Sequence, residues 1–343
     1  MININLKTPQ GTSQIFIGKG ISVEAANLVR QKYKGSRFVV VTDENLEKIY
    51  GEKLKKYLPD ALVISVPAGE ESKSIEMVTS LTKQLIENGF TRHDVMIGFG
   101  GGMVTDLAGF VASVYMRGMN YIAVPTSLLG MVDAAIGGKT GIDFIGKNLI
   151  GSFYFAEYVL MDPDMLKSFD DIKKSPGMGE VIKYAATINA SLFDDFEKEP
   201  LNLLTIIQKS VQAKVNVVSQ DFREKGLRKI LNYGHTFGHA IESVMEYKIS
   251  HDHAISIGMT LANKVAQKLG KQDASVGAKI KKTLEQFELP TSLPSNLQIG
   301  DLAEWIKKDK KRRGNIIDFV IVSELGKAEV YPIKAEELVK LAG

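Results

Sequence analysis

Four of the five histidines of this chain lie in one short window of its C-terminal half. His235 and His239 are four residues apart, so a helix would place both side chains on one face. His251 and His253 follow after a short segment that reads as a loop, and residues 254–269 again have a helical pattern. Imidazole is a common zinc ligand, and because the chain has no Cys, any further protein ligand is expected to be Asp or Glu.

A surface or structural role is the alternative interpretation for each of these histidines. Their clustering and the glycines between them favour a metal site instead. The segment from His235 to His239 has the paired histidines of the zinc-metalloprotease motif but lacks the Glu after the first histidine, which is the general base there. Peptide hydrolysis through that motif is therefore not indicated.

Glu180 is the candidate for a carboxylate ligand. It lies three residues before Lys183 on one face of a predicted helix, so a surface ion pair is the alternative interpretation. Its neighbours are Gly, Met, Val and Ile, which indicates a buried position, and a buried carboxylate without a partner is costly. A metal ion would offset that cost.

A second group of residues suggests a nucleotide site. The segment from Gly100 to Gly102 follows an apolar run and leads into a predicted helix that contains Thr105 and Asp106. Glycines let a backbone approach a pyrophosphate, and a helix N-terminus attracts the anion. The segment is not the G-x-G-x-x-G fingerprint, so a tight turn is the alternative.

Other charged residues follow predicted strands or lie between glycines. Asp43 follows one strand, where a carboxylate can bond ribose hydroxyls, and a loop with both Glu70 and Lys73 follows the next. Glycines flank Lys139 and Lys147, a pattern typical of anion-binding loops, although the P-loop signature for ATP is absent. Further along, Lys214 and Arg228 add cations, for which a solvated face is the alternative.

The elements that must position these residues alternate between strand and helix in the first half. Strands are predicted at 2–6, 14–17, 38–42, 61–66, 95–99, 120–124 and 158–161, with helices at 23–33, 44–58 and 74–88 between them. This order predicts a parallel α/β sheet, whose ligands bind beyond the carboxyl ends of the strands. After about residue 170 helical patterns dominate to Phe287, followed by a hairpin and a closing helix. We expect two domains, a nucleotide-binding type of α/β domain over residues 1–170 and a mostly α-helical domain over 171–343.

Composition places the chain among ordinary globular proteins. Of its 343 residues 44% are hydrophobic and 24% charged, and the net charge of +3 is too small to suggest nucleic acid or membrane as a partner. The N-terminus lacks the pattern of a signal peptide, and no apolar run is long enough to span a membrane. With no Cys, we expect a cytoplasmic protein.

A set of motifs runs through the chain in one order. They are Gly69-Glu-Glu-Ser-Lys73, Gly100-Gly-Gly-Met-Val-Thr-Asp106, Arg117-Gly118, Pro125-Thr-Ser-Leu-Leu129, Val132-Asp133, Gly137-Gly-Lys-Thr-Gly141, Gly146-Lys-Asn-Leu-Ile-Gly151, Glu180-Val-Ile-Lys183, Leu231-Asn-Tyr-Gly-His-Thr-Phe-Gly-His-Ala-Ile-Glu242, His251 and Asp309-Lys-Lys311. Together they resemble the 3-dehydroquinate synthase family, whose enzymes take the second step of the shikimate pathway toward chorismate and the aromatic amino acids. The resemblance covers nearly the whole chain and is weakest in residues 1–35 and 270–300.

The resemblance implies a Rossmann-like NAD-binding domain, a helical domain, tightly held NAD, one divalent metal (Zn²⁺ or Co²⁺) and a homodimer. It implies Glu180, His235 and His251 as metal ligands, and not His253. The implied NAD contacts are Asp43, Glu70, Lys73, Gly101, Gly102, Met103, Val104, Thr105, Asp106, Thr126, Ser127, Lys139, Lys147 and Ser168. The implied substrate and catalytic residues are Asp133, Lys139, Asn148, Lys183, Lys214, Arg228, Asn232, His239 and Lys310, with Arg117 reaching the partner's active site.

The implied enzyme is a carbon–oxygen lyase acting on a phosphate. It converts 3-deoxy-D-arabino-heptulosonate 7-phosphate to 3-dehydroquinate by transient oxidation with NAD, phosphate elimination, re-reduction, ring opening and aldol closure. The alternatives are another sugar phosphate cyclase, a metal-dependent polyol dehydrogenase of the glycerol type, and a non-enzymatic metal or nucleotide sensor. The chain departs from the usual family pattern at Ala134-Ala135, at Asp143 and at Asp252-His253, where Gly-Glu is usual.

Overall fold

The computed structural model describes residues 1–168, 176–307, 312–313 and 315–343 of the chain. By their contacts the residues divide into two compact units. The first comprises Met1–Asp170 and Lys214–Phe222, and the second comprises Asp171–Ala213 and Arg223–Gly343. A single boundary at residue 170 therefore misplaces the segment 214–222, which packs with the first unit. Because this segment continues a predicted helix, its local pattern gives no signal of that packing.

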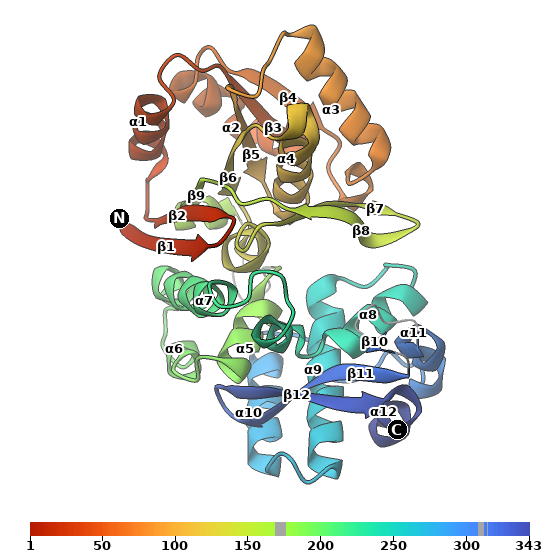
Figure 1. Ribbon diagram of the computed structural model, residues 1–343. Helices are drawn as coiled ribbons and strands as arrows, with labels where there is room; N and C mark the ends of the chain where they lie inside the picture. The colour runs from red at the N-terminus through yellow and green to blue at the C-terminus, as the bar shows by residue number, and fades with distance from the viewer. Residues whose placement is uncertain (169–175, 308–311, 314) are drawn as a thin grey trace. The chain divides into compact units, whose positions relative to one another are not determined.

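The first unit is built on a seven-stranded sheet with the strand order β1-β2-β9-β6-β5-β3-β4 (Figure 1). The strands are β1 (Ile2–Thr8), β2 (Gly11–Ile17), β3 (Phe38–Asp43), β4 (Leu62–Val66), β5 (Val95–Gly100), β6 (Asn120–Pro125) and β9 (Tyr158–Met161). Every neighbouring pair is parallel except β1 and β2, which form an antiparallel edge hairpin. The predicted parallel α/β architecture is thus confirmed.

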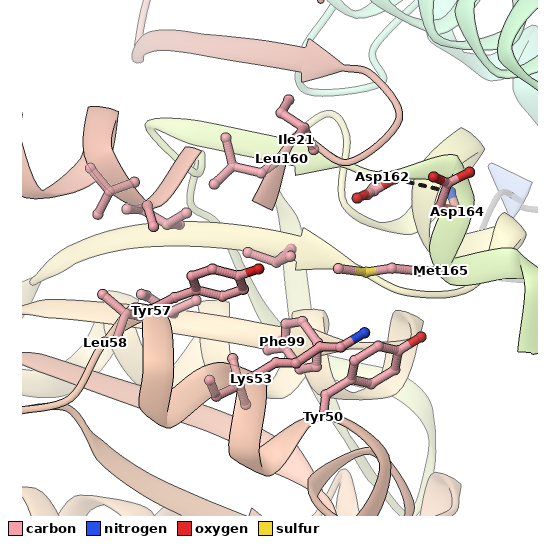
Figure 2. A pocket seen from close by; sticks show the side chains of 16 residues that line it. Ile21, Tyr50, Lys53, Tyr57, Leu58, Phe99, Leu160, Asp162, Asp164 and Met165 are labelled. Carbon is pink, nitrogen blue, oxygen red and sulfur yellow. Dashed lines mark hydrogen bonds between the residues drawn. The ribbon is translucent and has the colours of Figure 1, made fainter. Parts of the chain in front are cut away.

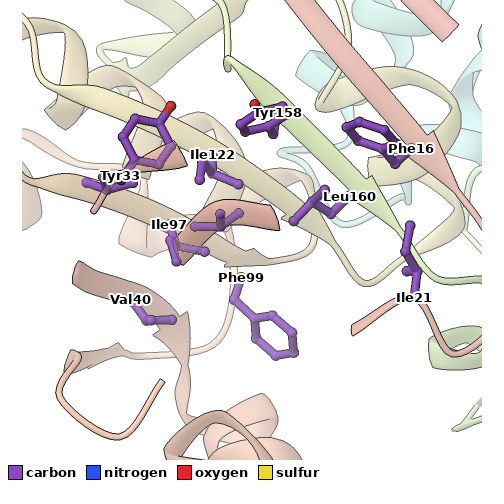
Figure 3. Packing of buried hydrophobic residues seen from close by; sticks show 11 residues of the cluster. Phe16, Ile21, Tyr33, Val40, Ile97, Phe99, Ile122, Tyr158 and Leu160 are labelled. Atoms are coloured by element: carbon purple, nitrogen blue, oxygen red, sulfur yellow. The ribbon is translucent and has the colours of Figure 1, made fainter. Parts of the chain in front are cut away.

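The helices and short turns of this unit follow its strands along the chain. They are α1 (Ser22–Lys32), α2 (Glu44–Tyr57), η1 (Glu70–Ser72), α3 (Ile75–Glu87), α4 (Gly102–Val114), η2 (Tyr115–Arg117), η3 (Gly130–Ala134) and η4 (Pro163–Ser168). On one face of the sheet, buried side chains including Val40, Ile97, Ile122 and Leu160 form a continuous apolar cluster (Figure 3). Leu46, Tyr50 and Leu54 of α2 pack against it with the four-residue spacing of an amphipathic helix.

Two paired strands of the first unit were not predicted from the sequence. Residues expected to form glycine-rich anion loops instead form the antiparallel pair β7 (Lys139–Phe144) and β8 (Gly146–Phe153). The pair depends on close backbone approach, because a Cβ on Gly141 would lie 2.7 Å from the carbonyl oxygen of Ile150. Glycine here serves strand pairing, which explains why the sequence read as loop.

The second unit is mostly helical, as predicted. Its elements are α5 (Met178–Thr187), α6 (Leu192–Phe196), α7 (Leu203–Val218, whose last residues belong to the first unit), η6 (Leu227–Asn232), α8 (His235–Val244), α9 (His251–Lys268), α10 (Ala274–Gln286), η7 (Ile299–Leu302), α11 (Ala303–Lys307), β10 (Arg312–Arg313), β11 (Ile316–Glu324), β12 (Lys327–Lys334) and α12 (Ala335–Ala342). The three strands form an antiparallel sheet that contains the predicted hairpin. Within the described ranges, no helix has the length and apolar character that crossing a membrane requires.

Candidate active site

The three predicted metal ligands lie together in the second unit. One ligand atom each of Glu180, His235 and His251 lies within 4.8 Å of the others. His235 Nε2 is 3.5 Å and His251 Nε2 3.3 Å from the same oxygen, Glu180 Oε1. The Glu180 side chain is only 1% exposed, while the two imidazoles are 12% and 26% exposed. Two nitrogens and a carboxylate oxygen thus converge at one partly accessible point.

The outer nitrogens of both imidazoles contact oxygen atoms. His235 Nδ1 is 3.1 Å from the carbonyl oxygen of Tyr233, and His251 Nδ1 is 3.2 Å from Glu242 Oε1. An oxygen acceptor at Nδ1 favours the tautomer with its proton there, which leaves the Nε2 lone pair directed toward the other ligands. This arrangement is the one in which histidine binds a metal through Nε2.

The local sequence explains how these helices come together. Each ligand lies in the first turn of its helix, so α5, α8 and α9 all begin near the cluster. A side chain at Gly258 of α9 would overlap the backbone of Gly234, and a Cβ on Gly238 would overlap Ile255. These three glycines therefore allow α8 and α9 to pack closely enough for the side chains of His235 and His251 to meet.

Burial and charge act in opposite directions on His251. Burial lowers the pKa of its imidazole, but hydrogen bonds with Glu180 and Glu242 outweigh burial and raise it to about 10. Lys183 forms an ion pair with Glu180, and both side chains are almost fully buried. The carboxylates of Glu180 and Glu242 therefore favour positive charge on His251, while the Lys183 ammonium offsets part of the charge of Glu180.

The remaining histidines of the window differ in their positions. His239 is exposed, but its ring centroid lies 5.2 Å from that of His235. His253 is exposed as well, and its backbone N–H donates to the helix-capping Ser250 Oγ at 3.3 Å. His253 is not in the ligand group that the described residues form. The spacing of His235 and His239 marked the right helix, although only the first of them joins the ligand cluster.

A cluster around Lys73 organises the predicted cofactor residues of the first unit. The Lys73 side chain is 3% exposed, and its ammonium lies 3.0 Å from Asp106 Oδ2 and 3.2 Å from Glu70 Oε1. It also donates to Asn148 Oδ1 at 2.6 Å, although the resemblance implied a substrate role for that residue. Burial raises the pKa of Asp106 to about 6, while Lys73 opposes the rise. We call these four residues the Lys73 cluster.

The carboxyl ends of three strands supply the other predicted cofactor residues. Asp43 ends β3 and caps α2, accepting backbone N–H bonds from Asn45 and Leu46 at 3.0 and 3.1 Å. The Thr126 backbone N–H donates to Gly100 O at 2.9 Å, which joins the ends of β5 and β6. Gly101 caps α4 without a side chain, and Gly102, Met103, Val104 and Thr105 follow in the first turn of that helix. These backbone N–H groups form an anion-attracting helix N-terminus.

Two further predicted residues, one cationic and one anionic, meet in the first unit. The Lys214 ammonium lies 2.7 Å from Asp133 Oδ1 and donates to the Asp133 carbonyl oxygen at 2.6 Å. These residues are 81 positions apart in the chain. The contact explains structurally why residues 214–222 belong to this unit.

Other predicted residues are more scattered. Arg228 is 2% exposed, and Asn232 donates to Glu224, which the sequence analysis did not single out. Arg117 is exposed and has a positive φ of 66°. Ser127 accepts a hydrogen bond from the Gly130 N–H at 3.1 Å, while Lys139 is exposed and Lys147 half-buried. Lys310 and the side chain of Ser168 lie outside the described residues.

A hollow of about 180 Å³ lies on one face of the sheet in the first unit (Figure 2). Its walls are mainly apolar, and Tyr50, Lys53, Asp162 and Asp164 supply polar groups. None of the predicted site residues is among those lining it. This hollow is thus distinct from the strand ends that carry Asp43, Gly101 and Thr126.

Sequence reasoning missed two buried carboxylates beside the metal-ligand cluster. Glu242, which contacts His251, is 2% exposed, and Asp252, which follows His251, is 6% exposed. Glu242 lies seven residues after His235, two helical turns along the same face, and this spacing could have identified it. The position of Asp252 carries no comparable signal, because its contacts are with a distant helix.

Comparison with known proteins shows the family of this chain. Residues 63–175 match the family described as 3-dehydroquinate synthase N-terminal, and residues 177–312 match the one described as 3-dehydroquinate synthase C-terminal. The chain is 42% identical over 312 residues to a 3-dehydroquinate synthase of Pyrococcus abyssi, covering 90% of this chain and 92% of the relative. It is 37% identical over 352 residues to a 3-dehydroquinate synthase of Clostridium acetobutylicum, covering 99% of both.

A solved structure shares the fold. A 2-deoxy-scyllo-inosose synthase complexed with carbaglucose-6-phosphate, NAD⁺ and Co²⁺ superposes with a TM-score of 0.88 at 22% identity, covering 99% of both chains. At 22% identity this structural similarity shows only that the fold is shared. The more similar sequences of the two 3-dehydroquinate synthases show the family. By identity over nearly its full length and by the match of both domains, the chain belongs to the 3-dehydroquinate synthase family.

Proposed function

We propose that this protein converts 3-deoxy-D-arabino-heptulosonate 7-phosphate to 3-dehydroquinate and phosphate. Family membership supports the reaction, and the convergence of Glu180, His235 and His251 is the structural observation that carries it. When bound, NAD supplies a hydride acceptor that is regenerated in each cycle, and Zn²⁺ or Co²⁺ supplies a Lewis acid for substrate oxygens.

Glu180, His235 and His251 would hold the divalent metal. The donor set suits zinc or cobalt, because both Nδ1 atoms are engaged with oxygens and both Nε2 atoms approach Glu180 Oε1. Three protein ligands leave coordination positions for substrate hydroxyls, as in catalytic zinc sites. Glu180 Oε1 and Glu242 Oε1 lie 3.3 and 3.2 Å from the two ring nitrogens of His251, and these carboxylates attract a cation to the same place.

The first unit would bind NAD through its strand ends. The helix N-terminus after Gly101 suits the pyrophosphate, and Asp43, at the end of β3, suits a ribose. Lys73 and Asp106 hold each other and so fix η1 against α4. We accordingly assign cofactor binding to the first domain, and metal binding to the second.

Buried cations would bind the two anionic groups of the substrate. The side chains of Lys183 and Lys214 are 2% and 6% exposed, and each is held by a carboxylate, Glu180 or Asp133. Ammonium groups fixed out of solvent bind a phosphate or carboxylate strongly. Lys139, Asn148, Arg228, Asn232 and Lys310 complete the proposed substrate set. His239, exposed and next to His235, would donate to the phosphate or move a proton.

We also propose a cytoplasmic homodimer in which Arg117 reaches the active site of the partner subunit. This assignment rests on the family resemblance. Arg117 is exposed, and both it and the neighbouring Met116 adopt positive φ angles.

Phosphate release tests the proposed reaction. The heptulosonate 7-phosphate is supplied with a trace of NAD⁺, with or without a chelator. Many turnovers per NAD, lost with the chelator and restored by Zn²⁺ or Co²⁺, are expected. His235→Ala and Lys139→Ala should abolish or strongly reduce release, which separates catalysis from binding alone.

The same assay distinguishes the alternatives. No phosphate from this substrate, with NAD and metal bound, would indicate a cyclase for a different sugar phosphate. Steady accumulation of NADH from a polyol would indicate a dehydrogenase, because that class releases its reduced cofactor.

A further inference from the structure

Helix α5, which bears Glu180, has no capping side chain of its own. The residue at its N-cap is Gly177, with a φ of 116°. The cap comes instead from Asp252, whose Oδ2 accepts the Gly177 N–H at 2.6 Å and the Gly179 N–H at 3.3 Å. Because the Asp252 side chain is buried, these two bonds are not replaced readily by water.

Asp252 is also the residue directly after His251, the first residue of α9. A single carboxylate on the helix that bears one metal ligand therefore holds the N-terminus of the helix that bears another. Glycine at position 179 makes room for it, since a Cβ there would lie 3.3 Å from Asp252 Oδ1. An anion at a helix N-terminus is favourable, and hydrogen bonds to a charged acceptor are stronger than neutral ones.

We propose that Asp252 is a positioning residue that fixes Glu180 relative to His251 and thereby sets the affinity and geometry of the metal site. This inference rests on the proposed function, because it takes the Glu180 cluster to bind a metal. Asp252 does not touch the convergent ligand atoms in this assignment; it acts through the backbone of α5. Gly177 and Gly179 lie on either side of the first residue of that helix, and Gly179 directly precedes Glu180.

Cobalt binding to metal-free protein tests the proposal without measuring activity. Co²⁺ is titrated into the wild type, Asp252→Ala and Asp252→Asn while the visible absorption bands are recorded. We expect Asp252→Ala to bind about tenfold or more weakly, the effect typical of losing a group that orients a ligand, with altered bands. Asn keeps an oxygen that can accept the Gly177 N–H, so Asp252→Asn should recover most of the affinity and the wild-type bands.

Asp273→Ala provides the matched control. Asp273 caps α10 in the same unit by accepting the Ser275 N–H at 2.8 Å, but it is exposed and outside the metal-ligand cluster. Its loss should lower the melting temperature and leave the cobalt bands unchanged. If Asp252→Ala does not fold, Gly179→Ala takes its place, because the added methyl would lie 3.3 Å from Asp252 Oδ1 and press the carboxylate away from the Gly177 and Gly179 N–H groups; weaker cobalt binding is again expected.

Wild-type affinity and bands in Asp252→Ala, or in Gly179→Ala where that variant is used, would overturn the proposal. An Asp252→Asn variant as weak as Asp252→Ala would also overturn it, since hydrogen bonding to α5 would then not be the cause. Glu180→Gln distinguishes failure of the underlying function. If the wild type binds no Co²⁺, or if Glu180→Gln binds it equally well, the metal assignment itself is wrong.

Discussion

In the second unit, the centre of the metal-ligand cluster is formed by lone pairs. His235 Nε2 and His251 Nε2 both approach Glu180 Oε1, so a proton or a metal ion is needed to make that arrangement favourable. In the first unit, the centre of the Lys73 cluster is an ammonium group that belongs to the chain. Asp106 and Asn148 accept hydrogen bonds from it, and Glu70 forms an ion pair with it.

This difference separates two kinds of motif residue. We propose that the metal-ligand cluster, formed by Glu180, His235 and His251, is completed by a bound metal ion. The Lys73 cluster is complete in itself, and it ties η1, α4 and the β7–β8 pair together. Lys73 therefore has a structural role beside any contact to NAD, whereas the role that we propose for His235 is metal binding.

Removing a metal ligand should have the largest effect on catalysis. His235→Ala is expected to lower kcat/KM by at least about a thousandfold, corresponding to about 4 kcal/mol of transition-state stabilisation. Phosphate release and metal content measure the change. His253→Ala is the matched control, because His253 is exposed and outside the ligand group. Equal losses in the two variants would contradict the assignment.

Removing the centre of the Lys73 cluster should have the largest effect on stability. Lys73→Met leaves the half-buried Asp106 carboxylate without its ammonium partner, and we expect a loss of about 3 kcal/mol in the free energy of unfolding. Urea unfolding of the protein without added NAD measures it. Lys83→Met is the control: Lys83 and Glu87 form an exposed pair at 3.7 Å, so its loss should change little. A neutral effect of Lys73→Met would mean that the cluster is not structural.

Substituting Glu242, which contacts His251, should have a smaller effect on the metal-ligand cluster than removing a ligand. Glu242→Gln removes the charge opposite His251 Nδ1 and should weaken metal binding about tenfold to a hundredfold. In the wild type without metal, the raised pKa of His251 adds stability that is fully present below the unfolded pKa of 6.5 and is lost as the pH rises toward about 10. In Glu242→Gln the folded pKa of His251 should be lower than in the wild type. The variant should therefore lose this stability at a lower pH and over a narrower pH range than the wild type.

Denaturant unfolding of metal-free protein between pH 6 and 10 measures that difference. Because metal binding displaces the His251 proton, metal affinity should also rise with pH in the wild type and rise less in Glu242→Gln. Parallel pH profiles in the two proteins would show that Glu242 does not govern His251.

The two clusters also show how far sequence could lead. Hydrophobic period predicted the strands and helices of the first unit. Residue type and spacing indicated a metal site among the clustered histidines, with Glu180 as the candidate carboxylate, whereas the choice of His235 and His251 came from the family resemblance. The Lys73 and Asp133 pairings could not be predicted, because they join segments 33 to 81 residues apart. The β7–β8 pair was missed for a related reason. Its glycines permit two backbones to approach each other, a tertiary requirement that resembles a loop signal in a single sequence.

Asp94, in the first unit, lies outside both clusters. Substituting it should have the smallest effect on stability, and the variant serves as a control for the variants of both clusters. Its carboxylate accepts the backbone N–H groups of Arg37 and Thr91 at 2.9 and 2.7 Å and pairs with the Arg37 guanidinium at 3.0 Å. Burial alone would raise the pKa of Asp94, but these donors lower it below its usual value. The resulting stability is present above the unfolded pKa and is lost as the pH falls through the folded one.

Asp94→Asn should therefore cost about 1 kcal/mol near neutral pH, and less as the pH falls toward 3. Thermal unfolding from pH 7 to pH 3 measures the convergence of the two proteins. Since Asp94 lies outside the proposed sites, the variant should retain phosphate release and cobalt binding, which His235→Ala should not. If Asp94→Asn lost cobalt binding as well, cobalt binding would depend on the overall stability of the protein. The cobalt data would then no longer distinguish the metal-ligand cluster from the Lys73 cluster.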